Sequence, residues 1–102
     1  MTAVLVLGRS RQIVDTVVAM IEDSGFGACG VTTVAAARAA LEKGSVSTLV
    51  IGAGVDLFFG TRLRRRAEAL GVRVIRARPG NSSPQAYVRE EVIPTLLHDG
   101  QR

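Results

Sequence analysis

The sequence has very little of the chemistry from which disulfides and metal sites are built. It contains one cysteine, Cys29, and one histidine, His98. A single cysteine cannot form an internal disulfide, so nothing in the sequence indicates an oxidising compartment. One cysteine and one histidine also fall short of the ligand cluster that holds a zinc ion. We therefore expect no resident metal and no other cofactor.

Long apolar runs are missing as well. No stretch approaches the roughly 20 apolar residues that a helix needs to cross a bilayer, and the N-terminal residues lack the pattern of a signal peptide. From these absences we expect a cytoplasmic protein with no membrane partner. Aromatic residues make up only 4% of the chain and do not alternate with basic ones. A stacking platform for single-stranded nucleic acid is therefore not expected.

Lysine is almost absent, because 12 of the 13 basic residues are arginine, and the net charge is +4. Seven of these arginines lie between Arg62 and Arg78, a stretch that contains one acidic residue, Glu68. Such a density of positive charge can attract an anionic partner. It is more typical of a solvated helix face, since the consecutive arginines at 64–66 must point in different directions. No nucleic-acid motif accompanies them, so we do not expect nucleic-acid binding.

What the chain does contain is an alternation of short apolar runs with amphipathic segments. The runs typical of buried strands cover residues 4–7, 27–32, 48–51 and 72–77. A helix is expected after each of four capping residues: Ser10, Thr33, Asp56 and Ser83. The expected apolar face of the first helix is Ile13, Val14, Val17, Met20 and Ile21, and that of the third is Phe59, Leu63, Ala67 and Leu70. Pro94 predicts a kink or a restart inside the last helix.

This alternation indicates right-handed crossovers and a parallel sheet. The sequence therefore predicts one α/β domain over residues 1–102, a three-layer α/β/α sandwich. Its four-stranded parallel sheet has the order 2-1-3-4, with helices on both faces. Ligands of such sheets bind beyond the carboxyl ends of the strands. That edge carries the segments 8–11, 52–54 and 78–83, so we expect any binding site there.

Residues 3–55 resemble the first half of a response-regulator receiver domain. The strand Val4–Leu7, the helix that ends in Ile21-Glu22-Asp23-Ser24-Gly25-Phe26, the alanine-rich second helix and the strand Leu49–Ile51 fall where that family has them. Arg78-Pro79, with a polar loop and a helix behind it, stands where receivers carry a Lys-Pro pair. The chain is shorter than a receiver by about one strand and one helix, which implies a trimmed, four-stranded version.

The acidic pocket of the receiver family is absent. Receivers bind magnesium with acidic residues after the first strand and accept phosphate on an aspartate after the third. This chain has Gly8, Arg9, Ser10 and Gly52 at those places, and none supplies a carboxylate. The resemblance therefore implies a pseudo-receiver, a non-catalytic interaction or signalling module that forms a homodimer or docks on a protein partner. Its expected contact residues are Phe58, Arg62 and Arg65.

A second interpretation is a small domain that binds a phosphorylated or nucleotide-like anion at the strand ends. Backbone donors at helix starts and nearby arginines would hold the phosphate. The candidate residues are Gly8, Arg9, Ser10, Arg11, Gly52, Gly54, Arg78, Ser82 and Ser83. Gly52-Ala53-Gly54 resembles the start of a dinucleotide fingerprint, but Leu57 occupies the place of its third glycine. A turn that needs positive backbone angles explains these glycines more simply.

An enzyme is less favoured than either of these two interpretations, and we assign no catalytic residue. His98 lies near the C-terminus, where no serine is arranged to meet it. Cys29 has no basic partner at a helix start, so we expect a small buried hydrophobe rather than a reactive thiol.

Overall fold

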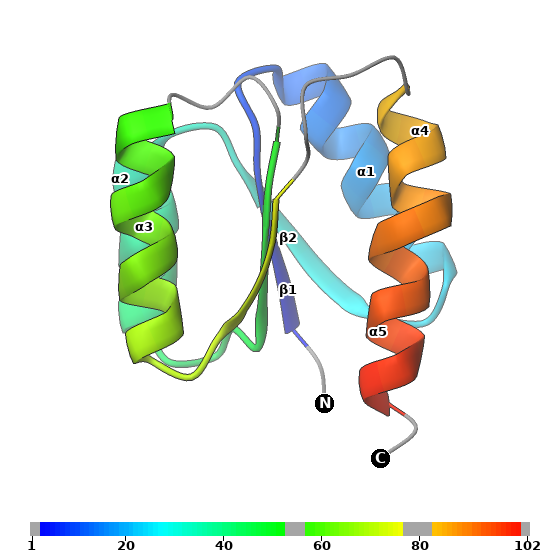
Figure 1. Ribbon diagram of the computed structural model, residues 1–102. Coiled ribbons are helices and arrows are strands. Elements are labelled where there is room, and N and C mark those ends of the chain that lie inside the picture. The colour runs from blue at the N-terminus through cyan, green and yellow to red at the C-terminus, as the bar shows by residue number, and fades with distance from the viewer. Residues whose placement is uncertain (1–2, 53–56, 77–82, 101–102) are drawn as a thin grey trace.

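The structure of the protein, a computed structural model, describes residues 3–52, 57–76 and 83–100 (Figure 1). In chain order the elements are β1 (Ala3–Leu7), α1 (Arg11–Asp23), β2 (Gly27–Val31), α2 (Val34–Glu42), β3 (Thr48–Ile51), α3 (Leu57–Ala69), β4 (Arg73–Arg76), α4 (Pro84–Tyr87), a π-helical turn (Val88–Val92) and α5 (Ile93–Gly100). Of the residues singled out above, Ala53, Gly54, Asp56, Arg78, Pro79 and Ser82 lie outside the described residues, and so do the side chains of Phe58 and Phe59.

The four strands form one parallel sheet in the order β2-β1-β3-β4, which confirms the predicted topology. Figure 1 shows the sheet as the middle of three layers, with α2 and α3 on one face and α1, α4 and α5 on the other. The alternation of strands and helices dictates this arrangement, because each helix must return the chain to the start of the next parallel strand.

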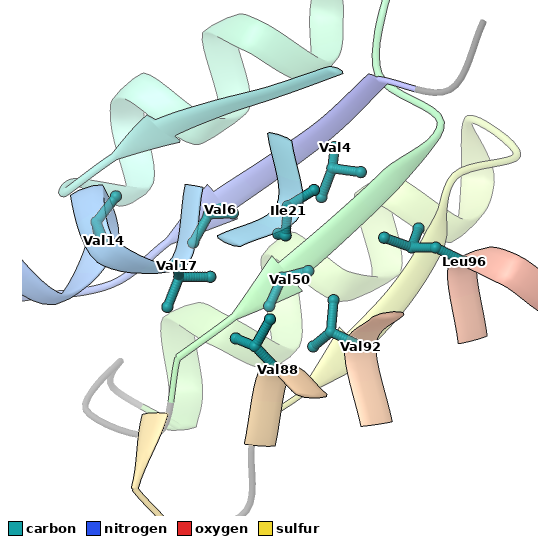
Figure 2. Close-up of a cluster of buried hydrophobic side chains, with 9 residues drawn as sticks. All are labelled: Val4, Val6, Val14, Val17, Ile21, Val50, Val88, Val92 and Leu96. Atoms are coloured by element: carbon teal, nitrogen blue, oxygen red, sulfur yellow. The ribbon is translucent and has the colours of Figure 1, made fainter. Parts of the chain in front are cut away.

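The central strands β1 and β3 have apolar side chains on both faces. Val4, Val6 and Val50 point to the side of α1 and the C-terminal helix, as Figure 2 shows, and pack there with Val14, Val17, Ile21, Val88, Val92 and Leu96. The alternate residues of β1 and β3 pack on the opposite face with α2 and α3; this second cluster includes Leu5, Leu7, Leu49, Ile51, Ala37, Leu41, Leu63, Ala67 and Val72. Burial on both faces explains why these strands are continuous apolar runs.

The helix starts follow the predicted capping residues where the structure describes them. Ser10 Oγ accepts a hydrogen bond from the amide of Ile13 at 3.4 Å, and Thr33 Oγ1 accepts one from Ala36 at 3.1 Å. Ser83 Oγ does the same for the amide of Ala86 at 3.1 Å. Each cap satisfies an amide that has no partner inside its helix.

Two residues expected on apolar helix faces are instead exposed. Ile13 of α1 is 46% exposed and Leu70, just beyond α3, is 43% exposed. Ile13 lies in the first turn of α1, and Leu70 directly follows the last turn of α3. At these two helix ends the apolar spacing continues beyond the part of the helix that the sheet covers. Within the described residues, no helix is both long enough and apolar enough to span a membrane.

The C-terminal helix changes its geometry directly before Pro94. It opens into a π-helical turn, where the amide of Ile93 donates to the carbonyl of Val88, and α5 then begins at Ile93. A proline inside an α-helix lacks one donor and collides with the carbonyl four residues earlier. The wider turn relieves this conflict and keeps Val88, Val92 and Leu96 buried against the sheet.

Candidate functional site

Gly8 and Gly52 follow the two central strands and lie against each other at the carboxyl edge of the sheet. A Cβ on Gly52 would lie 3.4 Å from the Cα of Gly8 and 3.2 Å from the carbonyl oxygen of Leu7. A Cβ on Gly8 would lie only 2.9 Å from Cγ2 of Val14 in α1. Both glycines therefore have a packing reason, because the turns after β1 and β3 approach each other and α1 more closely than a larger residue allows.

The amides of these glycines already have partners. Gly52 donates to the carbonyl of Leu7 at 2.7 Å, and Gly8 donates to that of Val31 at 3.2 Å. These bonds extend the ladders of the sheet by one residue. The structure thus brings Gly8 and Gly52 together as predicted, but it uses their N–H groups inside the fold rather than presenting them to a ligand.

The first turn of α1 holds the other described candidates of this edge. Ser10 is the cap of the helix, and Arg9 beside it is exposed. Arg11 turns toward β2, where Nη1 lies 3.4 Å from Oδ1 of Asp15 and 3.4 Å from the carbonyl oxygen of Gly30. Its charge is therefore shared with a carboxylate one helical turn away, a pairing that the spacing of four residues predicts.

Four arginines of the basic stretch, at 62 and 64–66, lie in α3, and two of them form its outer side. Gly60, Leu63 and Ala67 are buried against the sheet, whereas Arg62 and Arg65 are exposed on the opposite side of the helix. A helix places residues 62 and 65 on neighbouring turns of one face. We call this exposed pair, Arg62 and Arg65, the basic face of α3.

The neighbouring arginines of α3 are paired with acidic residues. Arg64 lies 4.0 Å from Glu68 of the same helix, and Arg66 forms an ion pair with Glu42 of α2. Glu68 is the only acidic residue between 57 and 69. The carboxylates of Glu68 and Glu42 are therefore directed to Arg64 and Arg66, which flank the basic face.

Arg76 at the end of β4 lies against α3. A Cβ on Gly60 would lie 3.1 Å from Nη2 of Arg76, so the guanidinium rests where any larger residue would stand. No spacing rule in the sequence connects Arg76 to Gly60. The contact depends on how β4 packs beside α3, which the linear sequence does not specify.

Cys29 is exposed, so the expectation of a buried small hydrophobe was wrong. Its neighbour Ala28 packs against the cluster beneath α1, and the alternation of a strand turns Cys29 to the other face. Because β2 is an outer strand, that face is incompletely covered there. Among the described residues, no group of three or more histidine, cysteine, aspartate and glutamate side chains is placed to hold a metal ion.

Comparison with known proteins identifies the fold and nothing narrower. No protein-family model matches the chain, and no curated protein matches it. A solved structure does match, the de novo designed Rossmann fold protein ROS2_835, with a TM-score of 0.55 and 20% sequence identity. The match covers 88% of this chain and 96% of the designed one. The chain therefore has a Rossmann-like α/β fold with a parallel sheet.

Proposed function

We propose that this protein is a non-catalytic, receiver-like interaction module that docks on an acidic surface of a protein partner through the basic face of α3. The observation that carries the proposal is the exposure of Arg62 and Arg65 on the side of α3 that faces away from the sheet. Glu68 and Glu42 form ion pairs with Arg64 and Arg66, the arginines that flank this face. The exposed guanidinium groups of Arg62 and Arg65 place positive charge on the outer side of the helix.

Arginine suits such a contact because its planar guanidinium donates paired hydrogen bonds to a carboxylate. Two arginines three residues apart on one helix match two carboxylates with a similar separation on a partner. In the sequence, aromatic residues do not alternate with basic ones as a platform for stacking nucleotide bases requires, which favours an acidic protein over a nucleic acid.

The receiver-like part of the proposal is supported by the strand order. The order 2-1-3-4 is that of the flavodoxin-like class, to which receivers belong, without its fifth strand. Glycines stand after β1 and β3, where the resemblance expects the acidic pocket and the phosphate acceptor. A module that retains the frame of a receiver without its carboxylates would act by binding rather than by phosphotransfer. Fold alone does not give function, so the proposal depends on the basic face.

The alternative, an anion-binding site at the carboxyl edge, remains a prediction with less support. The amides of Gly8 and Gly52 donate to carbonyls of the sheet, and Arg11 is paired with Asp15. Those three candidates would have to exchange existing partners for a ligand. The basic face of α3, by contrast, is exposed to solvent.

Charge reversal tests the proposal. The probe is a fluorescent peptide of alternating glutamate and alanine, and its binding is followed by fluorescence anisotropy at low salt. We expect Arg62→Glu/Arg65→Glu to weaken binding at least about tenfold, the loss of about 1.4 kcal/mol or more. The matched control is Arg9→Glu/Arg89→Glu, which changes the net charge equally at two exposed arginines elsewhere, and it should weaken binding far less.

Equal weakening by the two double variants would show attraction to net charge alone and would overturn the proposed face. A single-stranded oligonucleotide with the charge of the peptide is the second probe. Tighter binding to the oligonucleotide, lost in the same α3 variant, would move the function to nucleic acid and also overturn the proposal.

A further inference from the structure

The strand β2 ends the sheet with hydrogen-bonding groups directed outward. Gly8 donates to the carbonyl of Val31, so the peptide groups of Val31 face β1. Successive residues of a strand direct these groups to alternate sides, and those of Ala28 and Gly30 therefore face away from β1. The Gly30 carbonyl accepts the Arg11 guanidinium, as expected of an acceptor that β1 does not use. Such an edge is a template for another strand.

The two outer strands of the sheet differ in charge. β2, Gly27–Val31, contains neither a charged residue nor a proline, the features with which natural proteins block strand pairing. β4 carries an arginine at each end, Arg73 and Arg76. Charged residues on an edge strand oppose its pairing with another strand. Of the two edges, β2 is the one suited to pairing with itself.

We propose that two copies of the chain associate through antiparallel pairing of β2 with β2, around a two-fold axis at Cys29. In this register Ala28 lies opposite Gly30 of the second copy, and their outward amides and carbonyls bond to each other. Cys29 lies opposite its own copy as a non-hydrogen-bonded pair, with Cα atoms about 4.5 Å apart. The two four-stranded sheets then become one continuous sheet.

The charges of α1, the helix that packs on β2, support a second copy of the chain as the partner. α1 begins with Arg11 and ends with the exposed acidic residues Glu22 and Asp23. A two-fold axis through β2 reverses the second α1, so the basic start of one helix faces the acidic end of the other. The interface is therefore complementary to itself, as an isologous dimer requires. Because the arginine-bearing β4 edges stay outside, the pairing ends at the dimer.

Light scattering and oxidation test the pairing together. At tens of micromolar, we expect a mass of twice 10.8 kDa. Diamide should join the two Cys29 thiols, each losing a proton and an electron as diamide is reduced to its hydrazine, because the expected Cα separation suits a disulfide. The matched control carries Cys29→Ser with Arg73→Cys, an exposed cysteine on the opposite edge, and should crosslink at least tenfold more slowly.

Ala28→Pro tests the hydrogen bonds directly. It removes an outward donor that the monomer does not need, and proline is tolerated at such positions of edge strands. We expect a folded monomer by circular dichroism and light scattering. Cys29→Lys, which sets two ammonium groups at the axis, gives a second route to the monomer if the proline variant fails to fold. A monomeric wild-type protein, a dimer that Cys29→Lys leaves intact, or equal crosslinking by the Arg73→Cys control would overturn the proposal.

Discussion

Arg66 of α3 and Glu42 of α2 form a two-point ion pair that joins neighbouring helices on one face of the sheet. Nε donates to Oε1 at 2.8 Å and Nη2 donates to Oε2 at 3.1 Å. The hydrogen bond from Arg66 is the main cause that lowers the pKa of the Glu42 carboxyl below its usual 4.5, and the charge of Arg66 adds to it. The same bond raises the pKa of the Arg66 guanidinium.

This pair gives a pH-dependent contribution to stability. Because the folded pKa of Glu42 lies below the unfolded value, the pair stabilises the fold above that unfolded value, and the effect is lost as the pH falls through the folded pKa. Glu42→Gln should therefore lower the melting temperature at pH 7 by a small amount and have no effect under strongly acidic conditions. Glu90→Gln, an exposed carboxylate on the C-terminal helix, is the control. A difference in melting temperature between Glu42→Gln and the wild type that grows as the pH falls would contradict the assignment.

Gly30 should be intolerant of even a small side chain. A Cβ at this position would collide with Cγ1 of Val14 and lie 3.1 Å from Cγ2 of Val18, so α1 would have to move. We expect Gly30→Ala to lower the free energy of unfolding in urea by about 1–3 kcal/mol. The penalty should shrink in a Val14→Ala background, because that change removes the colliding methyl group. An equal penalty in both backgrounds would show that steric contact with Val14 is not the cause.

Phosphodonors should leave the protein unmodified. Gly8 and Gly52 stand where the receiver resemblance expects acidic residues, and their amides are bonded within the sheet. After incubation with acetyl phosphate and magnesium, intact mass spectrometry should show the mass of the unmodified chain. A stoichiometric phosphoryl adduct that is released at alkaline pH would contradict the reading of a receiver without phosphotransfer.

The architecture could be predicted from the sequence because the patterns that indicate its strands and helix starts are local. Apolar runs marked the strands, and Ser10, Thr33 and Ser83 marked helix starts through bonds that span only three residues. Gly27 and Gly30 dilute the apolar pattern that predicts strand β2. The structure confirms the strand. It also shows why Gly30 is a glycine, because a side chain there would collide with α1.

The contacts of the surface residues could be predicted from the sequence only in part. The pair of Arg11 with Asp15 follows from a spacing of four residues, whereas that of Arg66 with Glu42 spans 24 residues and depends on how α2 lies beside α3. The exposure of Cys29 likewise depends on how far the helices cover an outer strand. Local patterns do not specify the packing between layers, so the sequence placed the candidate residues along the chain without fixing which of them share a partner.

The most direct test of the account maps where ligands bind on the protein. In ¹⁵N-labelled protein, the backbone amide shifts are followed while the glutamate–alanine peptide is added in one titration and inorganic phosphate in another. We predict that the peptide shifts the amides of α3 around Arg62 and Arg65, and that Arg62→Glu/Arg65→Glu abolishes these changes. Saturable shifts confined to Ser10, Arg11 and the neighbouring strand ends, caused by phosphate while the peptide leaves α3 unchanged, would contradict the interaction module and support the anion-binding alternative.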